Sequence, residues 1–170
     1  MDTILQLAIE EASKFYGKPI HSRTILPIKF RTFGGPDCTF PTYDTIQVTV
    51  RNYCQSNNNS AYYQISHEAI HTLSPTDKNN VTFLEEGVAT RFSHDFLFKH
   101  TGTKWISSED PLYDEAWELV NKLVAVEDNA ISILFSKYRT LSDLTAQNII
   151  DEIPAVSQDL ADRLATKFYP

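Results

Sequence analysis

The chain has 170 residues, of which 42% are hydrophobic and 22% are charged, and its formal net charge is −7. This length and composition fit one globular domain with a core of its own. An acidic chain lacks the excess of Lys and Arg that binding to a phosphate backbone requires, so we expect no nucleic-acid partner. There is no apolar run of about 18 residues, and the first residues do not resemble a signal peptide. We therefore expect a cytoplasmic protein that makes no contact with a membrane.

The first 55 residues predict a leading helix followed by a small sheet. Apolar residues recur at helical spacing in residues 1–17, which favours an amphipathic helix. Residues 25–33 form a run of β-forming residues that ends at a Gly-Gly-Pro turn, and residues 38–43 are a shorter candidate strand. Apolar and polar side chains then alternate in residues 45–50, which is typical of a half-buried strand.

From residue 60 onward the sequence predicts helices separated by proline and glycine. The expected helices are 60–73, 82–99, 111–127, 129–138, 142–152 and 157–168. We therefore expect a single α+β domain over residues 1–170. A small mixed or antiparallel sheet, its leading helix and the helix at 60–73 would occupy about residues 1–75, and a helical lobe would occupy about residues 76–170.

The stretch H-E-A-I-H, residues 67–71, carries the clearest chemical pattern. Positions four apart lie on one face of a helix, so His67 and His71 can both reach one metal ion. Two imidazoles and a carboxylate suit zinc, with one position left for water. Glu68 is turned about 100° around the helix, where it can act as a general base toward that water. The alternative is an ordinary helix on which two histidines coincide by chance.

Two adjacent glutamates in T-F-L-E-E-G-V-A-T, residues 82–90, compete to be the third ligand. Thr82 and Glu85 have the spacing of a capping box, in which the carboxylate of Glu85 returns to the amide of Thr82. Glu86 points away from Glu85 and is the predicted ligand. Gly87 would let this helix cross the histidine-bearing helix closely. The alternative for Glu86 is a solvated acid that favours the helix dipole.

These motifs resemble the gluzincin metallopeptidases, in which H-E-x-x-H is followed by a helix that carries L-x-E-G-x-A. The resemblance covers about residues 44–92 and implies a zinc cofactor, a zincin-like fold and Glu86 as the third zinc ligand. It also implies an edge strand along which an extended peptide lies, and residues 45–50 stand in that place. The alternative is that this strand is central in its sheet. The chain departs from the pattern in its short gap between the second histidine and Glu86, and it has no recognisable exopeptidase motif.

The activity implied by the resemblance is zinc-dependent hydrolysis of a peptide or protein substrate. A metal-activated water attacks the peptide bond, and Glu68 is the general base. Tyr113, in the first turn of the helix at 111–127, is the predicted donor to the oxyanion. The alternative for Tyr113 is a packing role against Trp117 and Val120.

Two further residues of the helix at 82–99 lie near the predicted ligand in sequence. His94 is the reserve candidate for the oxyanion donor. It follows Glu86 by eight residues, which places it about 12 Å away along the helix axis, so we do not expect it to bind the metal. Thr90 follows Glu86 by four residues and could support the ligand, or it could be a neutral helix residue.

Two other functions remain open from the sequence. The chain could be a catalytically inactive or highly restricted zinc-binding protein with a regulatory or interaction role. Such a protein would contain zinc without cleaving general peptides, and it would unfold on chelation. The chain could also be a metal-free helical interaction domain, which metal analysis would separate from the other two.

Overall fold

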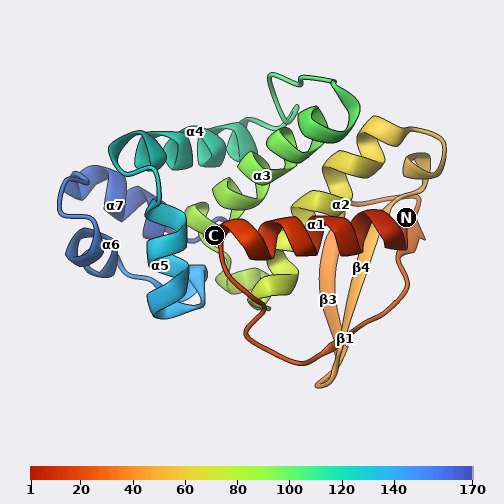
Figure 1. Cartoon of the computed structure of the whole chain (residues 1–170), viewed down its shortest axis with the longest axis horizontal. Coiled ribbons are helices and arrows are strands. Elements are labelled where there is room, and N and C mark those ends of the chain that lie inside the picture. The colour runs from red at the N-terminus through yellow and green to blue at the C-terminus, as the bar shows by residue number, and fades with distance from the viewer. Residues whose placement is uncertain (170) are drawn as a thin grey trace.

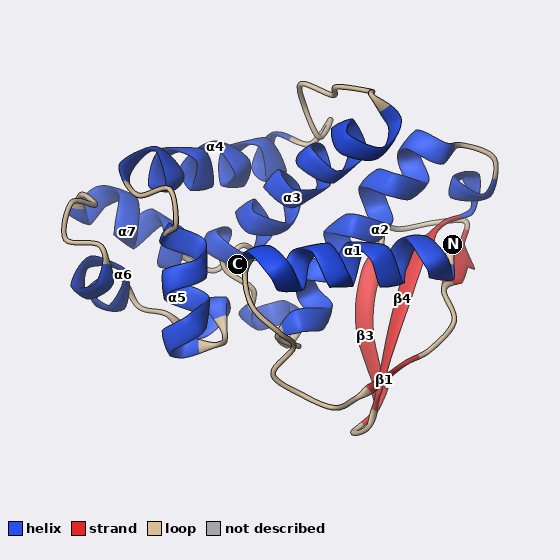
Figure 2. Cartoon of the chain, in the orientation of Figure 1, coloured by secondary structure: helices blue, strands red, loops and turns tan. Residues whose placement is uncertain are grey.

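The computed structural model describes residues 1–169, in which the chain is a mixed α+β structure. The sheet and α1 lie at one end of the molecule, and α5, α6 and α7 lie at the other (Figure 1, Figure 2). The strands are β1 (Thr24–Ile25), β2 (Lys29–Arg31), β3 (Asp37–Thr42) and β4 (Thr45–Arg51). The α-helices are α1 (Asp2–Phe15), α2 (Asn58–Leu73), α3 (Phe83–Thr101), α4 (Pro111–Val126), α5 (Ala130–Tyr138), α6 (Ala146–Glu152) and α7 (Gln158–Ala165). Three 3-10 helices in this range are η1 (Asn52–Gln55), η2 (Lys78–Asn80) and η3 (Leu141–Asp143).

The predicted α+β class is confirmed, with a leading helix, a small sheet and a largely helical second half. The division of the chain at about residue 75 stays a prediction, and Pro170 lies outside the described residues. No helix within residues 1–169 combines the length and the apolar character that crossing a membrane would need.

The sheet is built around β4, which pairs with each of the other described strands. β1 and β2 run parallel to β4, and β3 runs antiparallel to it. The prediction that residues 45–50 form the edge strand is therefore wrong, and the alternative of a central strand is correct. Among the described strands β3 pairs with β4 alone, so β3 is an edge strand.

The strand predicted at residues 25–33 is divided into β1 and β2. Pro27 lies at the break, where a proline has no N–H to give to a sheet ladder. The side chain of Gln47, which is buried in β4, donates a hydrogen bond of 2.7 Å to the carbonyl oxygen of Pro27. The break is thus held against the central strand by this side chain and by the amide of Leu26, which donates a 2.8 Å hydrogen bond to the carbonyl of Ile46.

The helix α2 runs through the middle of the molecule and packs against α1 and α3 (Figure 1). Its Ala61, Ile65 and Ala69 are completely buried. Deep burial on several sides explains why polar side chains on α2 are enclosed rather than solvated, and it places H-E-A-I-H inside the protein.

Gly87 permits one close approach between helices. A Cβ atom at Gly87 would lie 2.2 Å from the carbonyl oxygen of Ala116 and 2.5 Å from a methyl group of Val120. The prediction that Gly87 faces the histidine-bearing α2 is therefore wrong, because the helix that approaches Gly87 closely is α4. This contact fixes α4 against the N-terminal part of α3.

The helix predicted at 157–168 ends at Ala165, and an extended segment follows it. Lys167 forms an antiparallel bridge with Thr82. The amide of Phe168 donates a 2.9 Å hydrogen bond to the carbonyl of Val81, and the Phe168 ring is only 1% exposed. A segment near the end of the chain therefore anchors the loop that leads into α3. The helix predicted at 142–152 likewise begins later, with η3 preceding α6.

Candidate metal centre

The helix α2 presents both histidines of H-E-A-I-H on one face. Its N-terminus is capped by the side chain of Asn57, which accepts a 3.1 Å hydrogen bond from the amide of Ser60. His67, Glu68 and His71 are all buried. Buried polar groups need partners, and Glu85 and Glu86 in the first turn of α3 supply them to the two histidines.

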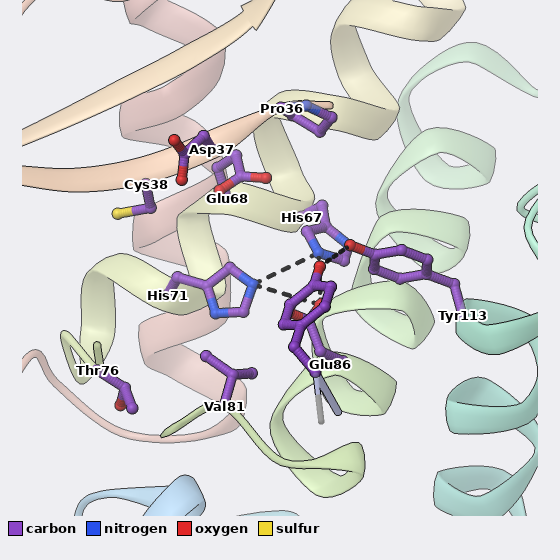
Figure 3. Close-up of a pocket in the computed structure, with 11 residues that line it drawn as sticks. Pro36, Asp37, Cys38, His67, Glu68, His71, Thr76, Val81, Glu86 and Tyr113 are labelled. Carbon is purple, nitrogen blue, oxygen red and sulfur yellow. Dashed lines mark hydrogen bonds and ion pairs between the residues drawn. The ribbon is translucent and has the colours of Figure 1, made fainter. Parts of the chain in front are cut away.

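Glu86 enters this face from α3, as predicted. Its Oε2 lies 3.0 Å from Nε2 of His67 and 3.6 Å from Nε2 of His71. The two imidazole nitrogens are themselves 3.4 Å apart. Figure 3 shows the three side chains pointing toward one another, His67 and His71 from α2 and Glu86 from α3. The structure thus brings together the three residues that the sequence predicted as ligands.

The spacing of these three groups suits a metal ion. Zinc bonded to nitrogen and oxygen at about 2.0–2.1 Å in a tetrahedron holds its ligand atoms about 3.3–3.4 Å apart. The observed separations of 3.0, 3.4 and 3.6 Å lie on both sides of that value. One ligand atom from each side chain lies within 4.8 Å of the others. His67, His71 and Glu86, here called the ligand triad, could therefore hold a metal ion.

The charges within the ligand triad are strongly coupled. Burial by itself would raise the pKa of Glu86, but the two histidines outweigh it and the pKa lies well below its usual value. Burial likewise works to lower the pKa of His71, but Glu86 and Glu85 outweigh it and the pKa is raised well above its usual value. Glu86 is therefore held as an anion. At Nε2 of His71, which faces Glu86, a proton and a metal ion compete for the same lone pair.

Glu85 has a different role from the one predicted. Its amide does donate the capping hydrogen bond to the Thr82 hydroxyl oxygen, at 3.5 Å. Its carboxylate, however, does not return to the Thr82 amide, which donates instead to Oγ of Ser142 at 3.1 Å. The carboxylate of Glu85 accepts hydrogen bonds from Nδ1 of His71, at 2.8 Å, and from the Ser142 hydroxyl. The capping box is therefore half formed, and Glu85 belongs to the site.

Glu68 lies on the side of α2 that faces β3. It lines a cavity of about 40 Å³ together with the ligand triad and with Asp37 and Cys38 of β3 (Figure 3). One water needs about 10–15 Å³ of such space, so the cavity has room for water beside the triad. Burial raises the pKa of Glu68, and the two histidines partly offset this effect. A buried carboxyl with a raised pKa beside a water-sized cavity fits the predicted general base.

Tyr113 reaches the same cavity from α4. Its ring lies edge-on to the His67 ring, with centroids 5.6 Å apart, and it also packs against Phe168. Its hydroxyl lies 2.6 Å from the hydroxyl of Tyr169, which lines the cavity too. Trp117, one of the packing partners considered for Tyr113, stacks on His94. Tyr113 therefore presents a hydroxyl to the site, and the sequence missed its partner Tyr169.

His94 lies outside the ligand triad, as expected. Its ring stacks on Trp117 at 3.9 Å, and its Nδ1 donates a 3.2 Å hydrogen bond to the carbonyl of Trp105. Tyr63 lies edge-on to the same ring, with centroids 5.1 Å apart. The hydroxyl of Thr90 is buried and has no hydrogen-bond partner within residues 1–169. His94 thus belongs to an aromatic cluster, and its reserve role as an oxyanion donor stays a prediction. A hydrogen bond from the Thr90 hydroxyl to the ligand triad is not observed in the described residues.

Comparison of the chain with models of protein families, with curated proteins and with solved structures found no match. The resemblance to gluzincins, carried by H-E-A-I-H and by the Glu86-Gly87 pair, accordingly stays a prediction. The function of the chain must be inferred from the geometry and chemistry of this site.

Proposed function

We propose that the chain is a zinc-dependent peptidase of the gluzincin type with a zincin-like fold. The convergence of His67, His71 and Glu86 on one point carries this proposal, with Glu68 adjacent in sequence to the first of them. Two imidazoles and one carboxylate are a ligand set that suits zinc and leaves one coordination position open, as catalytic rather than structural sites do.

The chemistry that zinc supplies when bound is polarisation of a carbonyl group and acidification of a water. Glu68 would act as the general base toward a water in the cavity beside it and would pass the proton on to the leaving amine. Its burial, which raises its pKa and favours the protonated carboxyl, assists the first of these transfers, the uptake of the proton. Tyr113 donates a hydrogen bond to the carbonyl oxygen as negative charge develops on it. Tyr169 holds the Tyr113 hydroxyl in place through the 2.6 Å contact between them.

The peptide would lie along β3 rather than along the strand at 45–50. Pro36, Asp37 and Cys38 line the cavity next to Glu68, so this end of β3 is the part of the sheet that reaches the site. An edge strand offers backbone N–H and C=O groups to an extended peptide, which adds to the sheet as a further strand. The scissile bond would then pass over the ligand triad.

The decisive experiment compares Glu68→Gln with wild type after purification without added zinc. We expect about one zinc per chain in both proteins and a loss of peptide hydrolysis of about 10²–10⁴-fold in the variant. Glu118→Gln, on the exposed face of α4, is the matched control and should behave as wild type. Wild-type activity in Glu68→Gln, or a wild-type protein that takes up no zinc, would refute the proposal.

The burial of the ligand triad favours a second function, a zinc-binding protein with no general peptidase activity. His67, His71 and Glu86 are each less than 10% exposed, as ligands of structural zinc sites are, although a hollow of about 950 Å³ borders His67 and Tyr113. This alternative predicts full zinc content and unfolding on chelation, with no cleavage of a mixed peptide library by wild type. Cleavage by wild type that Glu68→Gln abolishes would exclude it.

A further inference from the structure

We infer that Glu85 and Ser142 are positioning residues that set the orientation and the tautomer of the metal ligand His71. The inference depends on the metal-binding part of the proposed function and not on peptide hydrolysis. Three observations carry it: the contact of Glu85 with the outer nitrogen of His71, the anchoring of Glu85 by Ser142, and the burial of all three side chains.

The first observation concerns which nitrogen of His71 faces the ligand triad. Nε2 of His71 points to His67 and Glu86, while Nδ1 lies 2.8 Å from Oε1 of Glu85. A carboxylate can only accept a hydrogen bond, so this contact keeps the proton on Nδ1. The lone pair of Nε2 is then available to a metal ion. A carboxylate in this position also fixes the plane of the ring and raises its basicity as a ligand.

The second observation concerns what holds Glu85. Its other carboxylate oxygen accepts a hydrogen bond from the hydroxyl of Ser142 in η3. The same hydroxyl oxygen accepts a 3.1 Å hydrogen bond from the amide of Thr82, the residue that caps α3. Ser142 therefore ties together the support of His71 and the start of the helix that carries Glu86. Two ligands from two different helices are aligned through this one hydroxyl.

The third observation separates this arrangement from ordinary helix capping. Glu85 is 2% exposed and Ser142 is 3% exposed, so water does not replace their contacts. A capping box would direct the carboxylate of Glu85 to the Thr82 amide, but Ser142 takes that amide. The carboxylate accepts a hydrogen bond from His71 instead. This indicates a role at the site rather than at the helix end.

The test measures zinc affinity by competition with a chelator for Glu85→Ala, Glu85→Gln and Ser142→Ala. Removing such an outer partner typically weakens metal binding by about 10–100-fold, and we expect this for Glu85→Ala. Glu85→Gln keeps an acceptor for Nδ1 and should lose less, and Ser142→Ala should fall between Glu85→Gln and wild type. Asp143→Asn is the matched control, because Asp143 is the exposed neighbour of Ser142 in η3 and should bind zinc as wild type does.

A second measurement reports on the hydrogen bond itself. In zinc-loaded wild type, NMR should find a slowly exchanging proton on Nδ1 of His71. In Ser142→Ala that proton should exchange faster, and in Glu85→Ala it should be lost to rapid exchange with solvent. A purely structural role would lower stability without changing this signal. Glu85→Gln and Ser142→Ala provide the test if Glu85→Ala does not fold.

The outcomes separate this inference from the proposed function. Wild-type zinc affinity in Glu85→Ala, or a proton on Nε2 of His71 in the metal-free wild type with none on Nδ1, overturns the inference and leaves the peptidase proposal intact. Weakened zinc binding in the variants, in a protein that cleaves no peptide, overturns the peptidase proposal and supports the inference. A wild-type chain that takes up no zinc overturns both.

Discussion

The histidine pair of α2 and the single His94 of α3 lie on neighbouring helices and differ in what surrounds them. His67 and His71 on α2 face the carboxylates of α3, and their rings contact Glu85 and Glu86. His94 on α3 faces aromatic rings and stacks on Trp117. The pKa of His71 is raised by its acidic neighbours against the effect of burial. The pKa of His94 is lowered, and burial is the largest cause.

The difference shows that the partners, and not the residue type or the helix, decide what a histidine can do. Carboxylates around His71 hold one nitrogen with a proton and leave the other directed at the ligand triad. In His94, Nδ1 donates a hydrogen bond to the carbonyl of Trp105, and Nε2 lies 3.4 Å from the Tyr63 hydroxyl. Both nitrogens of His94 are engaged within the protein, so a metal ion would have to displace a contact.

The largest expected effect is on metal binding. His67→Ala should weaken zinc affinity by more than about 100-fold, because even the loss of an outer partner of a ligand costs about 10–100-fold. His94→Ala should leave zinc affinity unchanged and lower the free energy of unfolding by about 0.5–3 kcal/mol, through the lost stacking. Calorimetric zinc titration and chemical denaturation measure the two quantities. Equal losses of zinc affinity in both variants would contradict the comparison.

The next largest effect concerns two tyrosines, each of which lies edge-on to one of the compared histidines. Tyr113 faces His67 and Tyr63 faces His94. If Tyr113 is the oxyanion donor, Tyr113→Phe should lower kcat for peptide hydrolysis by about 100-fold while zinc content stays unchanged. Tyr63→Phe removes only a long hydrogen bond to His94 and should cost about 1 kcal/mol of stability, with little change in kcat.

Tyr169→Phe adds a control on the same prediction. It removes the hydroxyl that contacts Tyr113, but it leaves the Tyr113 hydroxyl in place. We expect a smaller fall in kcat than in Tyr113→Phe, because the donor remains but is less well fixed. If Tyr63→Phe lowered kcat as much as Tyr113→Phe does, Tyr113 would have no special role in hydrolysis.

Local spacing explains which parts of the site could be predicted from the sequence. His67, Glu68 and His71 follow from the geometry of one helix turn. Glu86 does join the histidines, as predicted. The argument that reserved Glu85 for the Thr82 amide was wrong, because Glu85 contacts His71 and the Thr82 amide donates to Ser142.

The remaining parts of the site depend on contacts between distant segments. Ser142 is 57 residues from Glu85 in sequence, and Tyr169 is 56 residues from Tyr113. No local pattern marks a serine in a 3-10 turn as the partner of a buried carboxylate. The edge strand was misplaced for a related reason, since the alternation in residues 45–50 shows burial on one face but not which strands pair with it.

The smallest effect concerns pH. Burial lowers the pKa of His94 in the folded protein, against opposing contributions from its contact with Trp105 and from Asp114 and Asp95, while His67 contributes in the same direction as burial. The unfolded chain has the ordinary histidine pKa of about 6.5, so below that pH it binds more protons at this position than the folded chain does. His94 therefore contributes stability that is present above about pH 6.5 and is lost as the pH falls through its folded pKa. His94→Phe keeps an aromatic ring against Trp117 and removes the titration.

The measurement is the free energy of unfolding of metal-free wild type and of metal-free His94→Phe between about pH 7 and pH 5. Other groups titrate in both proteins, so the difference between the two curves isolates His94. We expect wild type to lose more stability than the variant as the pH falls. The opposite order would mean that His94 gains rather than loses proton affinity on folding. The aromatic cluster would then resemble the acidic surroundings of His71, and the contrast between the histidine pair of α2 and His94 would disappear.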